Sequence, residues 1–150
     1  MLRSAKIEWT ARKLYKMVQR SEITFDNAVQ RGLVWDNKKK SLLIHSMLSG
    51  YPVPPFYAAK NGDKYDMLDG KQRINAVVDF IGGKFELEGI PEVESPNDDG
   101  TSDMVDINTL CFDEIEEPLR EELQDYSLTA YYFDAVTEEE VSEMFFRLNN

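Results

Sequence analysis

Asp69-Gly70-Lys71-Gln72-Arg73 is the stretch around which the chain is organised. An apolar-aromatic run at 65–68 leads into it, and a run with helical spacing leads out: Ile74, Val77, Val78 and Ile81. The pattern predicts a strand that ends at Asp-Gly and a helix that starts directly afterwards. Backbone N–H groups at a helix start have no partner within the helix and attract anions. Because Lys71 and Arg73 add two cations, the stretch is a candidate phosphate site.

The same stretch also has a purely structural interpretation. Asp-Gly turns are common, so Asp69 and Gly70 could form a strand-to-helix turn that leaves Lys71 and Arg73 in solvent. In the functional interpretation, the planar guanidinium of Arg73 binds two phosphate oxygens at once. Asp69 then holds a divalent metal or orients an attacking water. Spacing alone leaves both interpretations open.

Length and composition favour a single folded domain over residues 1–150. One cysteine and one histidine exclude an internal disulfide, a multi-cysteine zinc site and a histidine-rich metal centre. They also leave little material for a Ser-His-Asp triad. No apolar run approaches the roughly 20 residues that cross a bilayer, and Met1 to Trp9 lacks the apolar core of a signal peptide. We therefore expect a cytoplasmic protein with no membrane partner.

The charge of the chain is strongly negative and unevenly distributed. The formal net charge is −11, whereas broad binding to nucleic acid normally needs a positive surface. Many of the basic residues lie within 1–40, and most of the carboxylates lie within 86–143. The first part could therefore face an anion, while the second part should repel one.

Capping residues and glycines predict the elements of the first half. Thr10 is expected to cap a helix that ends near Gln19, and Asp36 to cap a helix over 37–49 that Gly50 ends. Asn61-Gly62 predicts a hairpin between strands at 56–59 and 64–68. The remaining expected elements are a short extended piece at 21–25, a helix over 71–81 ended by two glycines, and a short strand at 85–87.

The second half begins with an acidic segment rich in turn-forming residues. We expect 91–104 to be a mobile acidic surface loop within the domain. Pro118 suits the first turn of a helix that reaches about residue 125, and 126–133 has the composition of a strand. Thr137 and Glu140 form a capping box for a last helix. Because this apolar helix runs to the end of the chain, we expect the domain to be truncated at its C-terminus.

Four further residues or pairs are candidates for function. Gln30-Arg31 is expected on a loop, where Arg31 is either a second phosphate clamp or a surface arginine paired with carboxylates. His45 is expected in solvent rather than as a general base, and Cys111 as a buried inert thiol rather than a nucleophile. Trp35 is expected in the core, with a base-stacking platform as the alternative.

Taken in order, these motifs resemble the N-terminal domain of the GmrSD-type, modification-dependent restriction enzymes. The resemblance rests on the run Gln30-Arg31-Gly32-Leu33-Val34-Trp35, the helix 42–50, the prolines at 52–55, Asp69-Gly70-Lys71-Gln72-Arg73 and the segment Phe146-Arg147-Leu148-Asn149. It extends from about residue 10 to the C-terminus. Several motifs in the same order are more specific than any one of them.

The resemblance implies an α+β, ParB/sulfiredoxin-like fold, in which helices surround a small mixed sheet. It also implies NTP binding and hydrolysis at the D-G-Q-Q-R motif, with Mg, inside bacterial or phage DNA restriction systems. By this resemblance Asp69 and Gln72 are catalytic residues, and Asp69 is also the metal ligand. The residues implied in nucleotide binding are Gln30, Arg31, Gly70, Lys71, Arg73 and Asn149.

The chain departs from the family pattern at one position of the loop. Lys71 stands where the family has glutamine; lysine keeps a donor, but it puts hydrolysis in doubt if that glutamine orients water. The family's HNH-type nuclease module would need clustered histidines, so we expect the nuclease as a separate domain or subunit and DNA as an indirect partner. A sulfiredoxin-type reaction is not expected, because the motif loop holds no cysteine. The alternative function is a nucleotide- or DNA-sensing domain without turnover.

Overall fold

The computed structural model describes residues 1–25, 34–134 and 136–148. Its centre is a five-stranded mixed sheet in the order β1-β7-β3-β4-β2. The pairs β1–β7 and β3–β4 are antiparallel, whereas β7–β3 and β4–β2 are parallel. The strands are β1 Ser4–Thr10, β2 Ile23–Thr24, β3 Phe56–Asn61, β4 Lys64–Asp69 and β7 Ser127–Asp134.

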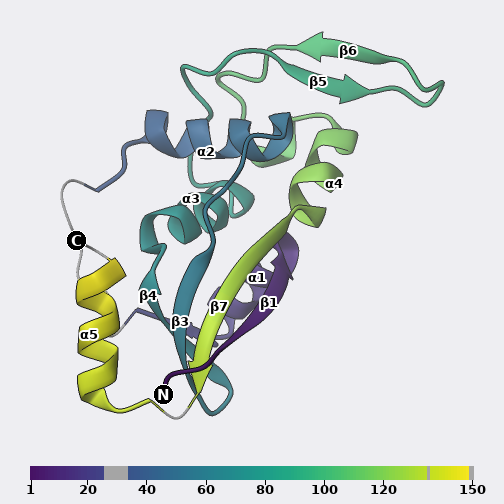
Figure 1. Cartoon of the computed structure of the whole chain (residues 1–150). Helices are drawn as coiled ribbons and strands as arrows, with labels where there is room; N and C mark the ends of the chain where they lie inside the picture. The colour runs from purple at the N-terminus through teal and green to yellow at the C-terminus, as the bar shows by residue number, and fades with distance from the viewer. Residues whose placement is uncertain (26–33, 135, 149–150) are drawn as a thin grey trace.

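Five α-helices are described around this sheet (Figure 1). They are α1 Ala11–Gln19, α2 Asn37–Ser49, α3 Lys71–Ile81, α4 Glu117–Asp125 and α5 Glu138–Leu148. The expected caps are present: the Thr10 hydroxyl accepts from the Lys13 N–H at 3.1 Å, and the Asp36 carboxylate accepts from the Lys39 N–H at 2.9 Å. The expected α+β class, a small mixed sheet with helices around it, is confirmed; the likeness to the ParB/sulfiredoxin fold stays a prediction.

Alternating residues of the strands enter two separate apolar clusters. Phe56 and Ala58 of β3 are fully buried in the main core, together with side chains of α1, α2, α3 and α4. Ala59 instead packs with Leu68 and Met144 in a small cluster beneath α5. Successive side chains of a strand point to opposite faces of a sheet. The main core and α5 therefore cover opposite faces.

The segment 91–104 is not the loop that its composition predicts. It contains most of a second, two-stranded sheet, in which β5 Val93–Pro96 pairs antiparallel with β6 Ser102–Val105. Val93 and Ser95 are buried while Glu94 is exposed, which is the alternation of a strand. The carboxylates and turn-forming residues concealed this alternation, and the mobility of the segment stays a prediction.

Two smaller expectations, about residues 85–87 and His45, are also wrong. Residues 85–87 form no strand, although Leu87 exchanges backbone hydrogen bonds with Thr109 and Leu110 at 2.6 and 3.0 Å. His45 is only 7% exposed, and its Nε2 lies 3.3 Å from the Ser49 hydroxyl. The reason is that α2 packs on α3 beneath it and also touches α4 and β5, so more than one side of the helix is covered.

None of the described helices is both long enough and apolar enough to span a membrane.

Candidate functional site

The Asp69–Arg73 motif forms the turn between β4 and α3, as its sequence predicts. β4 ends at Asp69, Gly70 stands at the N-cap position with φ +110°, and α3 begins at Lys71. A Cβ atom at Gly70 would lie 2.4 Å from Cδ1 of Phe56, so only glycine fits against this ring. The first residue of β3 and the motif are therefore packed together directly.

The start of α3 is arranged to receive a negative group. Glycine offers no side chain to cap the helix, and no side chain of the described residues caps this end by a hydrogen bond. The first helical bond runs from the Ile74 N–H to the Gly70 carbonyl at 2.9 Å, so the N–H groups of the residues before Ile74 precede the helical ladder. The helix dipole adds partial positive charge at the same place.

Arg73 is held by four neighbours from the same end of the sheet. Its Nη1 donates to the Pro54 carbonyl and, at 3.4 Å, to the Pro55 carbonyl. Its Nη2 donates to Asp69 Oδ2 at 3.2 Å, and the guanidinium lies 4.9 Å from the centre of the Phe56 ring. The side chain is 12% exposed, and burial lowers the pKa of Arg73 while Asp69 opposes this shift. Arg73 thus joins the two prolines that precede β3 to the end of β4.

Asp69 is the more accessible member of this pair, with 32% of its side chain exposed. Within the described part of the chain, no group of three or more His, Cys, Asp or Glu side chains gathers where a metal ion could bind. Mg²⁺ commonly binds proteins through one or two carboxylates and completes its shell with phosphates and water. Asp69 therefore fits the role of a single protein ligand to a metal that arrives with a nucleotide.

The first turn of α3 also contacts both sides of the segment 26–33. The Nζ atom of Lys71 lies 5.8 Å from the centre of the Phe25 ring, just before this segment. The Gln72 Oε1 accepts from the Trp35 N–H at 3.2 Å, shortly after it. Phe25 and Trp35, which lie on either side of this segment in the sequence, are therefore both at the first turn of α3.

Three of the predicted site residues are not located by the structure. Gln30, Arg31 and Asn149 lie outside the described residues. Sequence reasoning missed the contacts of Phe25, Pro54 and Pro55 with the motif. The two prolines lie close to a predicted strand start, but nothing in their spacing identified Arg73 as the partner.

Trp35 and Cys111 occupy intermediate positions. Trp35 is half-buried against the main core, and the Lys39 Nζ lies 5.3 Å from the centre of its ring. Cys111 is half-buried rather than buried, and its N–H donates to the Glu114 carboxylate at 2.9 Å. Burial, followed by Glu114, raises the pKa of the thiol. The thiol is therefore poorly suited to act as a nucleophile.

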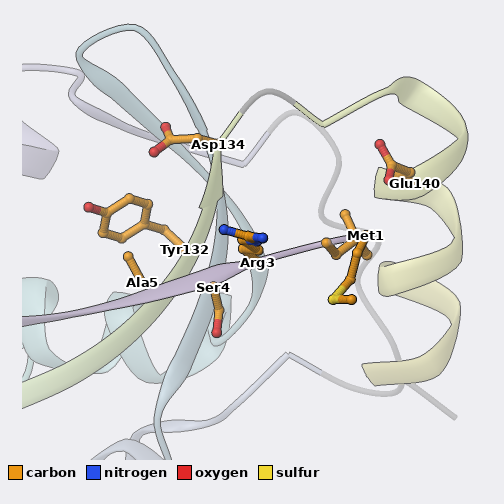
Figure 2. Close-up of a pocket in the computed structure, with 8 residues that line it drawn as sticks. Met1, Arg3, Ser4, Ala5, Tyr132, Asp134 and Glu140 are labelled. Carbon is orange, nitrogen blue, oxygen red and sulfur yellow. The ribbon is translucent and has the colours of Figure 1, made fainter.

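A separate open cavity of about 440 Å³ lies at the beginning of β1. Figure 2 shows Arg3 and Ser4 from this end of the chain, Asp134 from the end of β7 and Glu140 from α5. The cavity shares no residue with the motif, so it is not part of the candidate phosphate site.

Comparison with protein families now adds to this geometry. The family described as the GmrSD restriction endonuclease, N-terminal domain, matches residues 13–150. The chain belongs to the GmrSD N-terminal domain family. No curated protein and no solved structure matches it. The GmrSD match includes the whole of the Asp69–Arg73 motif, and its description associates the chain with DNA restriction.

Proposed function

We propose that this domain binds a nucleoside triphosphate at the start of α3 and hydrolyses it with Mg²⁺, as a module of a bacterial or phage restriction system. The observation that carries the proposal is the turn at Gly70. There a strand ends at a carboxylate, and a helix with glycine at its N-cap position begins directly after that glycine. Helix starts of this kind bind phosphate through backbone N–H groups and the helix dipole.

The roles of the residues follow from where the motif places them. The N–H groups of the first turn of α3 and the ammonium of Lys71 receive the phosphates. Asp69 holds the metal or orients the attacking water, and Gln72 connects this turn to Trp35. Arg31, Gln30 and Asn149 complete the nucleotide site in this proposal.

Arg73 has a positioning role in the proposed site. It donates to the carbonyls of Pro54 and Pro55 and to the Asp69 carboxylate, which occupies three of the five N–H donors of a guanidinium. Direct phosphate binding by Arg73 stays a prediction, and the phosphate would have to share the guanidinium with these contacts. Arg73→Ala should therefore lower both nucleotide affinity and stability.

Nucleotide binding is tested by calorimetry with each of the four NTPs. We expect Lys71→Ala and Arg31→Ala each to lower the affinity for the bound NTP about tenfold or more, because each removes a charge-assisted contact to phosphate. Lys64→Ala is the matched control, since Lys64 is an exposed lysine at the opposite end of β4. If the affinity for NTP is unchanged in both Lys71→Ala and Arg31→Ala, the proposal is wrong.

Hydrolysis is tested separately, by phosphate release in the presence of Mg²⁺. We expect Asp69→Asn to abolish release while nucleotide still binds. A specific observation favours the alternative of sensing without turnover: Asp69 already accepts from Arg73, and Gln72 Oε1 from Trp35. If wild-type protein binds NTP but releases phosphate no faster than Asp69→Asn, the domain is a nucleotide sensor.

The nuclease of the restriction system is the proposed partner of this domain. The matched family is the N-terminal domain of a restriction endonuclease. We propose that a nuclease domain or subunit cuts DNA, and that nucleotide at α3 regulates it. DNA then contacts the nuclease rather than this acidic domain.

A further inference from the structure

β1 is a long edge strand, one residue shorter than its neighbour β7. It has seven residues and stands at the end of the strand order, with β7 on one side. Among the described residues no strand pairs with its other side. Figure 1 shows β1 along the edge of the sheet away from α5. Such an edge presents a row of backbone N–H and C=O groups to any strand that can align with it.

β1 has neither a proline nor a bulge to protect its edge, and its charged side chains Lys6 and Glu8 are the edge-protecting feature that it does carry. Its sequence, Ser-Ala-Lys-Ile-Glu-Trp-Thr, contains no proline. Its register with β7 runs without a bulge from Ser4 opposite Phe133 to Thr10 opposite Ser127. Proteins commonly block an edge with a proline, a bulge or a short strand. The backbone of the β1 edge is therefore free to pair with a strand whose charges match those of Lys6 and Glu8.

Two charged side chains of β1 are arranged symmetrically about Ile7. Lys6 and Glu8 are each 56% exposed, and the Lys6 Nζ lies 3.9 Å from the Glu8 Oε1. Both point to the same face of the sheet, because they are two residues apart in a strand. Their neighbours on β7 are the uncharged Tyr131 and Thr129, so β7 provides no directly opposite ionic partner for either.

This symmetry makes the strand complementary to itself. If two copies of β1 pair antiparallel about Ile7, each Lys6 lies directly opposite Glu8 of the other copy. The same register places Ser4 opposite Thr10 on the charged face and Ala5 opposite Trp9 on the face of the main core. Opposite charges at directly paired positions stabilise an antiparallel pair, and like charges destabilise it.

We propose that two copies of this chain associate through their β1 edges, antiparallel about Ile7, and join their two sheets into one. Pairing of β1 with a second copy of itself requires opposite charges at equal distances from one central residue, and Lys6 and Glu8 meet this requirement. Pairing with a strand from an unrelated protein would not require this symmetry. The family match begins at residue 13, so β1 Ser4–Thr10 precedes the matched residues. The association is independent of the nucleotide site at α3.

The first test is the mass of the protein in solution. Sedimentation is measured at chain concentrations on the order of 100 μM, because two paired edge strands form a small interface and small interfaces tend to be weak. We expect wild-type protein to approach twice the 17.3 kDa of one chain as concentration rises. Lys6→Glu and Glu8→Lys should each weaken association about tenfold or more, because both cross-strand pairs become repulsive. Lys64→Glu, which makes the same charge change away from this edge, should associate like wild type.

The decisive test restores complementarity without restoring the sequence. An equal mixture of Lys6→Glu and Glu8→Lys chains places opposite charges against each other again, so we expect mixed dimers to form. The double variant Lys6→Glu/Glu8→Lys should also dimerise with itself. Circular dichroism confirms that each variant is folded, since both side chains are exposed. The proposal is overturned if wild-type protein stays monomeric, if neither single variant weakens the dimer, or if the mixture stays monomeric.

Discussion

Single residues determine the geometry of the turn between β4 and α3. Gly70 combines a left-handed backbone with close contact to the Phe56 ring. Arg73 holds the Pro54 and Pro55 carbonyls and the Asp69 carboxylate together. A partly buried arginine that bonds three acceptors positions its neighbours, because each N–H···O contact restricts the group that accepts it. The motif is thus a structural unit as well as a candidate phosphate site.

Gly70→Ala should destabilise the domain by about 3 kcal/mol, because the new methyl group adds overpacking to backbone strain. Urea unfolding measures this change. The matched control is Gly62→Ala, where φ is also positive, at +62°, but no atom lies within 4 Å of the added Cβ. The control should lose only about 1 kcal/mol from backbone strain. Equal losses in the two variants would contradict the contact with Phe56.

Cys111 should react slowly with iodoacetamide at neutral pH. Burial and Glu114 raise the pKa of the thiol, so the reactive thiolate is a smaller fraction at any pH below that pKa. The rate should rise with pH to a midpoint above that of an unstructured cysteine peptide, which serves as the control. A midpoint at or below that of the peptide would show that the raised pKa is wrong.

Whole elements divide the domain into a main core and a smaller cluster. α1, α2, α3 and α4 supply the main core, whereas α5 packs on β4 through a few apolar residues. The expected capping box at the start of α5 is present, with the Thr137 hydroxyl and the Glu140 N–H 3.1 Å apart. The cap stabilises the helix itself, but only the apolar contacts fix its place on the sheet.

Met144→Ala should lower the free energy of unfolding by about 2–3 kcal/mol, because it removes the central side chain of the smaller cluster. Phe146 lies two residues further along α5 and is 57% exposed. Phe146→Ala should therefore change stability by only about 0.5 kcal/mol or less. Chemical denaturation compares the two. A larger loss for Phe146→Ala than for Met144→Ala would mean that α5 contacts the sheet through another face.

At the scale of the molecule, the sheet brings together residues that are distant in the chain. The ends of β2 and β4 and the beginning of β3 meet at the motif, so Phe25, Pro54 and Arg73 become neighbours. Lys39 and Lys71 lie near this end, although the whole chain carries a net charge of −11. A localised positive group can bind a small anion even where the total charge repels a long polyanion.

Purified protein should form no complex with duplex DNA in a gel-shift experiment at about 0.15 M salt, because a long polyanion meets the negative field of the whole chain. A basic DNA-binding domain on the same probe is the positive control. A discrete shifted band that survives this salt concentration would contradict the expectation and favour direct DNA sensing.

The sequence by itself determined the motif and most of the helices, but it did not predict the strands β1, β5 and β6. Caps at Thr10 and Asp36, the Asn61-Gly62 hairpin and the helix after Gly70 follow from local backbone preferences and from the spacing of apolar residues. Such preferences act within a few residues, and so they can be recognised without knowing the fold. The interpretation of 91–104 as a loop is wrong. In β5, buried and exposed residues alternate, but the many carboxylates of the segment make this alternation hard to recognise in the sequence.

The tertiary structure alone decided which distant residues meet the motif. The burial of His45, the bonds of Arg73 to Pro54 and Pro55, and the Gln72–Trp35 contact all depend on packing between elements. No local sequence pattern predicts these contacts, because each depends on how α2, β3 and α3 are placed relative to one another. The same is true of β1: its sequence predicts no open edge, and only the strand order leaves one side of it without a partner among the described strands.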